Sequence, residues 1–193
     1  MKINDLDLKN WKNLDINVDS LWIIDKRDNS GVHSASYHGN FVPQIPNQLL
    51  RRFTKQGDFI LDPFLGSGTT LIESQRLNRN GIGIELQAEV AKNSKQLIKQ
   101  EENAKVISDV YIGDSSNFSY EKLLDKYNIK NVQFILYHPP YWDIIKFSNN
   151  EKDLSNTKSL NEFLSKLEKV IVDSTKILEK GRYCAIVIGD MYK

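Results

Sequence analysis

A rigid turn that could hold a planar ligand stands at residues 138–141, where the sequence reads His138-Pro139-Pro140-Tyr141. The two prolines have fixed φ angles and no N–H donors, so the carbonyl groups of the turn point in set directions. Tyr141, and Trp142 after it, could stack on a planar ring. The apolar run 132–137 before the turn predicts a buried strand. The turn would therefore lie at the carboxyl end of a strand, where α/β sheets bind their ligands.

A glycine turn earlier in the chain has the features of a nucleotide-binding loop. Residues 62–70 read Asp62-Pro63-Phe64-Leu65-Gly66-Ser67-Gly68-Thr69-Thr70. Gly66 and Gly68 can adopt positive φ and carry no Cβ, so a ligand can lie against bare backbone at the start of the following helix. The absence of a Lys before Thr69 disfavours ATP and GTP, and Leu71 in place of a third glycine disfavours NAD. A plain structural turn is the alternative.

Two acidic residues end the next two predicted strands. Glu85 lies 17 residues after Gly68, close to the roughly 20 expected for a carboxylate that binds ribose hydroxyl groups. Asp114 could accept a hydrogen bond from the amino group of adenine. Either acid alone could equally be a helix N-cap or a surface residue. Together with the glycine turn, and in this order, they predict a nucleoside pocket.

The elements that must position these residues alternate along the chain. From residue 58 onward, strand-like and helix-like segments follow one another, which favours an α/β fold with a parallel sheet. A capping box at Ser159 is expected to begin a long amphipathic helix that Gly181 ends. Leu21 to Ile24 could add a strand. The other predicted strands are 58–61, 81–85, 106–113, 132–137 and 183–188, and the other predicted helices are 47–55, 69–79, 88–105 and 120–127.

Residues outside the alternating pattern are assigned to an arm and a loop. Residues 1–37 are predicted to be an N-terminal arm and irregular segment, of which the first 20 are loosely attached, and residues 38–193 one domain. The polar stretch 142–157 is expected to be a lid, a binding loop or disordered. The basic residues Arg51 and Arg52 are interpreted as a solvated helix face rather than a phosphate contact.

Composition limits the class of protein. A chain of 193 residues with 40% hydrophobic residues suits one domain, and a formal charge of +1 does not favour nucleic acid through a global basic field. The single Cys184 excludes a disulfide framework and a cysteine zinc site, which fits the reducing cytoplasm. No run approaches the roughly 20 apolar residues of a membrane span. His33 and His38 have no partners at metal-ligand spacing, so no metal site is predicted.

With these motifs in this order, the chain resembles the S-adenosylmethionine-dependent amino-methyltransferases of DNA, which methylate cytosine N4 or adenine N6, as in restriction-modification. Residues 62–70 look like the family's DPFxGSGTT cofactor loop, and residues 138–141 look like its catalytic tetrapeptide. The resemblance covers roughly residues 38–190. It implies a Rossmann-like methyltransferase fold with helices on both faces of a mainly parallel sheet, S-adenosylmethionine as cofactor, and duplex DNA with a flipped base as partner.

The resemblance also implies a set of site residues. Phe41 lies in a stretch that in this family closes over the methionine part of the cofactor. The implied catalytic residues are His138, Pro139, Pro140 and Tyr141. The implied cofactor-binding residues are Phe41, Asp62, Phe64, Gly66, Gly68, Thr69, Glu85 and Asp114.

The tetrapeptide departs from the family pattern at its first position. The family usually has Asp, Asn or Ser where this chain has His138, which leaves the target base open, although Trp142 resembles the SPPYW form often associated with cytosine N4. An exocyclic amine is a poor nucleophile because its lone pair is delocalised into the ring. The Pro139 carbonyl and a neutral His138 could each accept one amine hydrogen, while Tyr141 stacks on the base.

Two other functions remain open from the sequence. RNA guanine-N2 methyltransferases share a similar loop and a similar Pro-Pro-Tyr turn, so the substrate could be an RNA base. The chain could also be a non-catalytic S-adenosylmethionine-binding subunit of a split enzyme. Sheets of this family normally have further strands after the fifth. We therefore expect the last strands to be absent, and the chain to be a fragment or half enzyme that self-associates or binds a partner through the uncovered strand 183–188.

Overall fold

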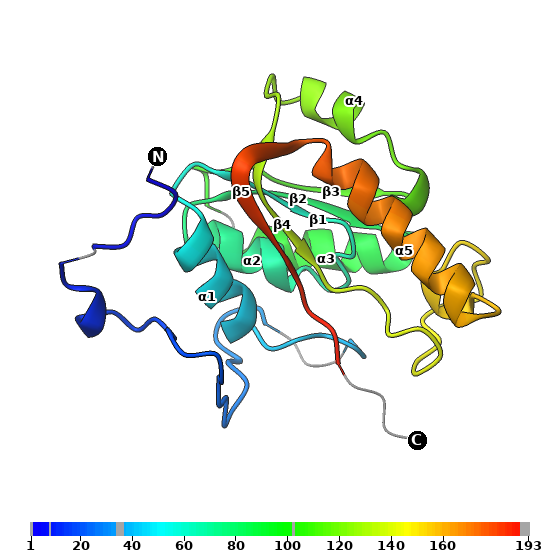
Figure 1. Ribbon diagram of the computed structural model, residues 1–193, viewed down its shortest axis with the longest axis horizontal. Coiled ribbons are helices and arrows are strands. Elements are labelled where there is room, and N and C mark those ends of the chain that lie inside the picture. The colour runs from blue at the N-terminus through cyan, green and yellow to red at the C-terminus, as the bar shows by residue number, and fades with distance from the viewer. Residues whose placement is uncertain (1, 8, 34–36, 102, 190–193) are drawn as a thin grey trace.

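Five parallel strands form the centre of the molecule, which is shown as a computed structural model in Figure 1. The structure describes residues 2–7, 9–33, 37–101 and 103–189. The strand order is β3-β2-β1-β4-β5, and every neighbouring pair is parallel. The predicted α/β fold is therefore confirmed. The strands are β1 Phe59–Asp62, β2 Asn80–Glu85, β3 Ser108–Ile112, β4 Val132–Tyr137 and β5 Leu178–Ile186.

Helices cover both faces of the sheet, as predicted. One face carries α1 Gln44–Phe53, α2 Thr69–Arg76 and α3 Ala88–Gln100, and the other carries α4 Tyr120–Asp125 and α5 Leu160–Thr175 (Figure 1). The part of the chain that the structure describes also contains the short 3-10 helices η1 Trp11–Asn13, η2 Ser115–Asn117 and η3 Leu154–Asn156. Among the described residues, no helix has the length and apolar character required to cross a membrane.

The period of two along β4 divides its side chains between the two helical layers. Ile135 and Tyr137 pack in the cluster that includes α4 and α5, whereas Phe134 and Leu136 pack with Leu50 of α1. Because both faces are covered, a strand of this kind reads as a nearly continuous apolar run. The continuous apolar run at residues 132–137 therefore predicted a strand, although apolar and polar residues do not alternate along it.

Two predicted features of the backbone are wrong. Leu21 to Ile24 form no strand, and the side chains that would have packed are exposed, Leu21 at 74% and Ile23 at 78%. Gly181 does not end a helix, because α5 ends at Thr175 and Gly181 lies inside β5. There its φ of 83° accommodates the irregularity between the pairs Val132–Leu178 and Phe134–Tyr183.

The N-terminal arm is bound to the body rather than loosely attached. Asn4 Nδ2 donates to the Arg52 carbonyl at 2.7 Å, and Asp5 Oδ2 accepts from the Gln56 N–H at 2.6 Å. Arg51 Nη1 donates to the Asp15 carbonyl at 2.6 Å, so the basic residues of α1 hold the arm instead of forming a solvated face. Residues 1, 34–36 and 190–193, which fall at the edges of the two predicted segments, lie outside the described residues.

A buried ion-pair cluster fastens the end of the arm to α2. His33 Nε2 lies 2.7 Å from Glu73 Oε1, and both side chains are almost fully buried. Asn47 Nδ2 donates to Glu73 Oε2 at 2.7 Å, and Arg76 Nη1 lies 3.2 Å from Oε1. This cluster fixes the chain just before residues 37–41.

Candidate functional site

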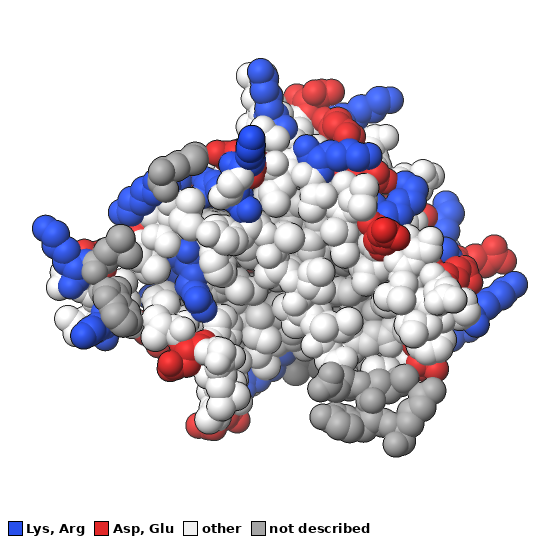
Figure 2. All heavy atoms as spheres, viewed as in Figure 1, with Lys and Arg blue, Asp and Glu red and all other residues white. Residues whose placement is uncertain are grey.

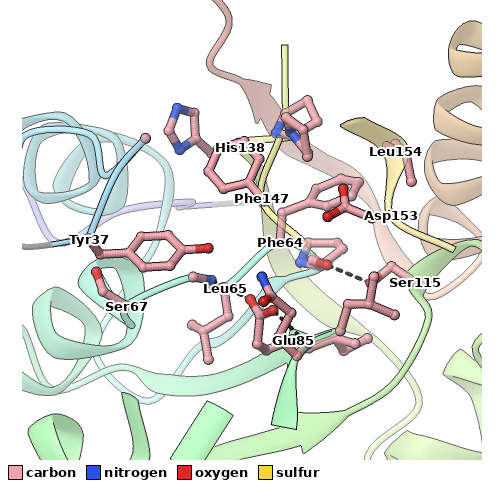
Figure 3. Close-up of a pocket in the computed structure, with 18 of the residues that line it drawn as sticks. Tyr37, Phe64, Leu65, Ser67, Glu85, Ser115, His138, Phe147, Asp153 and Leu154 are labelled. Carbon is pink, nitrogen blue, oxygen red and sulfur yellow. Dashed lines mark hydrogen bonds between the residues drawn. The ribbon is translucent and has the colours of Figure 1, made fainter. Parts of the chain in front are cut away.

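A pocket opens at the carboxyl ends of the central strands and contains most of the predicted site residues (Figure 3). Including its open mouth, it has a volume of about 970 Å³. The glycine loop, the ends of β2 and β3, and the turn after β4 converge on it, as expected for residues at one edge of a parallel sheet. The predicted residues that line it are Phe41, Phe64, Gly66, Glu85, Asp114, His138, Pro139, Pro140 and Tyr141.

Gly66 brings bare backbone to the wall of the pocket. Its φ is 54°, and a Cβ at this position would lie 3.0 Å from Cε1 of Tyr37. The loop is attached to β2, because the Leu65 N–H donates to the Ile84 carbonyl at 3.0 Å. An aromatic ring can therefore lie directly on the glycine peptide.

Asp62, Gly68 and Thr69 do not line the pocket. Gly68 precedes α2 with a φ of 91°, and a Cβ there would face Cδ1 of Ile98 at 3.0 Å. Thr69 Oγ1 donates to Asn40 Oδ1 at 2.7 Å. The fully buried Asp62 accepts from the Phe64 N–H at 2.9 Å. These three residues lie behind the wall of the pocket and shape the loop, and their role in cofactor binding stays a prediction.

The Glu85 carboxyl group is buried at the base of the pocket. Oε2 accepts from the Gly66 N–H at 3.0 Å, and Oε1 accepts from the Gln87 N–H at 2.8 Å. Burial is the main cause that raises the pKa of Glu85 to about 7, although both hydrogen bonds act in the opposite direction. The side chain thus connects the glycine loop to β2 and can change its charge near neutral pH.

Asp114 is a helix N-cap that also lines the pocket. It is the N-cap of η2, where Oδ1 accepts from the Ser116 N–H at 2.9 Å. The Ser116 hydroxyl donates to the same oxygen at 2.7 Å. Among the described residues, none hydrogen-bonds Oδ2. Since Asp114 also lines the pocket, its second oxygen could accept from a ligand.

His138 is a neutral hydrogen-bonding group at neutral pH, because burial lowers its pKa to about 4. Its Nε2 lies 2.8 Å from the Tyr141 hydroxyl oxygen. The Phe41 ring meets the imidazole edge-on, with ring centroids 4.5 Å apart. The imidazole is therefore held from two sides, by segments nearly one hundred residues apart in the chain.

Trp142 lies elsewhere than predicted. It adopts a φ of 46°, which is uncommon for an aromatic residue. Its ring packs in a cluster with Leu154, Phe163 and Leu167 instead of lining the pocket beside Tyr141. The left-handed backbone turns this side chain away from the ligand edge. Trp142 therefore anchors the loop that follows the turn.

That loop, residues 142–157, forms part of the pocket wall and is ordered by its own side chains. Asp153, only 4% exposed, accepts from the Ser155 N–H at 2.9 Å and from the Ser148 hydroxyl at 2.7 Å. The loop contributes Ile144, Ile145, Phe147, Lys152, Asp153 and Leu154 to the pocket. The Asp-x-Ser pattern of a short cap was present in the sequence and is the signal that could have revealed this ordered segment.

The pocket also includes Tyr37 and Asn40, which the sequence did not single out. The rings of Tyr37 and Phe147 face each other, with centroids 6.3 Å apart. Burial raises the pKa of the Tyr37 hydroxyl, and the nearby Glu85 and Asp153 raise it further. Figure 3 shows Tyr37, Glu85 and Asp153 around the same space. No sequence pattern connects these residues, because they meet only through the fold.

Comparison with protein families gives a match over the first half of the chain. Residues 2–100, which are 99 of the 193 residues, match the N6/N4 family model described as "DNA methylase". The matched range includes the arm as well as the glycine loop and Glu85.

Three curated proteins with similar sequences are each longer than this chain. Type II methyltransferase M.MjaII from Methanocaldococcus jannaschii is 33% identical over 113 residues, which cover 52% of this chain and 21% of that protein. M2.DpnII from Streptococcus pneumoniae is 43% identical over 67 residues, or 33% and 25% of the two chains. M.MthZI from Methanothermobacter thermautotrophicus is 34% identical over 123 residues, or 56% and 33%. The matched regions thus span about a fifth to a third of these relatives.

Solved structures share the fold at low sequence identity. TrmN from Thermus thermophilus superposes with a TM-score of 0.54 at 19% identity, covering 76% of this chain and 38% of that one. SMU.1697c from Streptococcus mutans, a putative methyltransferase in complex with SAH, gives 0.51 at 12% identity, covering 74% and 69%. The predicted Rossmann-like methyltransferase fold is confirmed.

Proposed function

This chain belongs to the N6/N4 DNA methylase family, and from that premise we propose that it transfers a methyl group from S-adenosylmethionine to an exocyclic amine of a DNA base, cytosine N4 or adenine N6. One observation carries the proposal. The buried Glu85, the partly exposed Asp114 and the turn 138–141 line one pocket, so a nucleoside cofactor and a planar acceptor can meet there. We propose that the reaction serves restriction-modification and takes place in the cytoplasm.

The cofactor half of the pocket offers acceptors for a nucleoside. Glu85 would accept from the ribose hydroxyl groups, and the second carboxyl oxygen of Asp114 would accept from the adenine amine. Phe64 and Phe41 supply aromatic surface, and Gly66 supplies exposed backbone. Asp62, Gly68 and Thr69 would hold the glycine loop in shape. When bound, S-adenosylmethionine supplies a methyl group on a sulfonium.

The turn after β4 would hold the target amine. The Pro139 carbonyl and His138 each accept one amine hydrogen, which favours a pyramidal nitrogen with its lone pair directed at the methyl carbon. The amine nitrogen would accept the methyl carbon as that carbon leaves the sulfonium sulfur, and the extra amine proton would then pass to solvent. Because the proton leaves after attack, a neutral His138 suffices as an acceptor.

A base inside a duplex must leave the stack to reach this pocket. Unstacking costs a few kcal/mol, and stacking on an aromatic side chain returns about 1–3 kcal/mol. Tyr141 supplies that ring, and Pro140 fixes the backbone beside it. We therefore assign duplex DNA with a flipped base as the substrate.

Tritiated methyl transfer to duplex DNA, single-stranded DNA and tRNA tests the proposal. Transfer to DNA is expected, and transfer to tRNA alone would overturn the substrate assignment. Glu85→Ala should weaken cofactor binding by about ten- to hundred-fold. Tyr141→Ala should abolish most turnover at unchanged cofactor affinity. Absence of cofactor binding by the parent chain would overturn the function itself.

The edge strand β5 is the proposed partner surface. Tyr183, Ile186 and Ile188 are 46%, 48% and 61% exposed on or just after this strand. Figure 2 shows few charged side chains at the centre of this face of the molecule, with Lys and Arg around its rim. An apolar strand edge is a pairing template. A second copy or a partner chain would add a strand here.

A further inference from the structure

The Tyr141 hydroxyl is hydrogen-bonded to one nitrogen of His138. This contact affects which of the two imidazole nitrogens carries the hydrogen. Nε2 is 2.8 Å from the hydroxyl oxygen. Among the described residues, Nδ1 has no hydrogen-bond partner. A neutral imidazole has one N–H donor and one acceptor nitrogen, and the partner of one nitrogen determines the state of the other.

Two arrangements are chemically possible. If the hydroxyl donates to Nε2, then Nδ1 carries the hydrogen and presents a donor. If Nε2–H donates to the hydroxyl oxygen, then Nδ1 keeps its lone pair and presents an acceptor. Both hydrogens of an exocyclic amine need acceptors, and a donor at Nδ1 would repel them.

We propose that Tyr141, besides offering its ring, acts through its hydroxyl as a positioning group that accepts from His138 Nε2–H and so leaves Nδ1 as the acceptor for the target amine. This inference rests on the proposed function. The ring orientation it requires is supported from the other side, where Phe41 meets the imidazole edge-on at 4.5 Å. The hydroxyl oxygen can accept from Nε2 and still donate its own hydrogen to solvent, because Tyr141 is only half-buried.

Nitrogen-15 NMR of the chain labelled at histidine tests the tautomer without any substrate. The His138 signals are assigned by their loss in His138→Asn. The expected result at pH 7 is a protonated Nε2 and an unprotonated Nδ1. A protonated Nδ1 in the parent overturns the proposal, whatever the enzymatic activity.

A double-mutant cycle separates this role from a structural one. Tyr141→Phe keeps the ring and removes one hydrogen bond, so kcat should fall by about tenfold while the KM for S-adenosylmethionine stays unchanged. In His138→Asn, an amide oxygen takes the place of Nδ1. This oxygen is an acceptor whatever its neighbours are, so Tyr141→Phe should have almost no effect on kcat in that background. An equal loss of kcat in both backgrounds would show that the hydroxyl only supports the fold.

Different results would contradict the proposed function and the proposed role of the Tyr141 hydroxyl. If the parent binds cofactor but methylates neither DNA nor RNA, the proposed function is wrong, while nitrogen-15 NMR of the parent and of Tyr141→Phe still reports whether Tyr141 fixes the tautomer. If the parent methylates DNA and kcat is unaffected by Tyr141→Phe, the hydroxyl role is wrong and the function stands.

Discussion

Glu85 is a buried acid whose pKa lies near physiological pH. Its ordinary pKa of 4.5 is raised to about 7 by burial. A group with a raised pKa in the folded state favours folding fully below its unfolded pKa, and this contribution is lost as the pH rises through the folded pKa. The free protein should therefore lose stability between about pH 4.5 and 7 on account of Glu85. Ribose hydroxyl donors would favour the ionised form and offset this loss.

Cofactor affinity should consequently rise with pH. Below pH 7 the protonated Glu85 is a poorer acceptor, so Kd should fall as the pH increases from about 6 to 8, by at most tenfold per unit for one proton. Calorimetry at several pH values measures this. Glu85→Gln is the control. Its side chain does not titrate, so any pH dependence of its affinity comes from the cofactor or from other groups, which affect both proteins equally. Parallel pH profiles for the two proteins would contradict the role of Glu85.

Asp62 is a buried acid whose charge the fold disfavours. Burial raises its pKa to about 6, against the opposite effects of the nearby Thr70 hydroxyl and of the hydrogen bond from the Phe64 N–H. Neither Oδ2 of Asp62 nor the Thr70 hydroxyl meets the geometry of a hydrogen bond within the described residues. An amide in place of the carboxyl group could donate to the Thr70 hydroxyl.

Asp62→Asn should therefore stabilise the protein at pH 8. The raised pKa corresponds to a penalty of a few kcal/mol above pH 6, of which an isosteric amide should recover a part. Denaturant unfolding at pH 8 and pH 5 measures the change in the free energy of unfolding. The gain should shrink at pH 5, where the carboxyl group is already protonated. A loss of stability at both pH values would show that the carboxylate is required.

At the scale of elements, the pocket depends on how two irregular segments meet. Residues 37–41 and the loop 142–157 contact each other at Gly39, which has a φ of 78° and no space for a side chain. A Cβ there would lie 2.7 Å from Cζ of Phe147. Gly57 has a similar φ of 81° but nothing within 4 Å of the same position. These two glycines form a matched pair.

Gly39→Ala and Gly57→Ala should lose similar stability through the backbone, about 1–2 kcal/mol each. Only Gly39→Ala should also displace Phe147, so only it should weaken the binding of S-adenosylmethionine. Chemical denaturation and calorimetry of the two variants make the comparison. Equal affinities in the two variants would show that the contact of the loop with residue 39 does not shape the pocket.

The regular elements were largely predictable, and their junctions were not. The bounds of β4 agree with the predicted strand 132–137. The capping box correctly predicted the start of α5, where Ser159 Oγ accepts from the Glu162 N–H at 3.2 Å. The start of β5 was missed because Gly181, a good helix-ending signal, serves a strand irregularity instead. A glycine can end a helix or lie at an irregular point of a strand, and only the pairing with a neighbouring strand decides which.

The same distinction explains which site residues the sequence revealed. Glu85, Asp114 and His138 follow strands, and strand ends of a parallel sheet meet at one edge. Tyr37 and Phe147 lie in segments without periodicity, and their meeting depends on how two loops fold back. The position of the Trp142 ring was predicted wrongly because it depends on a left-handed backbone φ. The sequence gives no sign of this conformation, since aromatic residues rarely adopt it.

For the whole molecule, we propose that the β5 edge determines the state of association. Self-association through this edge should make the mass from light scattering rise with concentration. Ile186→Lys places a charge on the exposed strand and should shift the chain towards the monomer. Val172→Lys, at a position of α5 that is 50% exposed, is the control and should have no effect. A parent chain that is monomeric at all concentrations would contradict pairing between copies and leave a different polypeptide as the partner.

The hydrogen bond from Arg182 Nη1 to the Ile3 carbonyl joins residues 179 positions apart. Arg182 also lies 3.0 Å from Asp58 Oδ2, just before β1, so one guanidinium connects the arm, the first strand and the last. Contacts between such distant positions form slowly, because the entropy of closing the intervening chain must be overcome first. The arm can use this contact only after β5 has joined the sheet. During synthesis on the ribosome, the arm would therefore make this contact only after β5 has emerged.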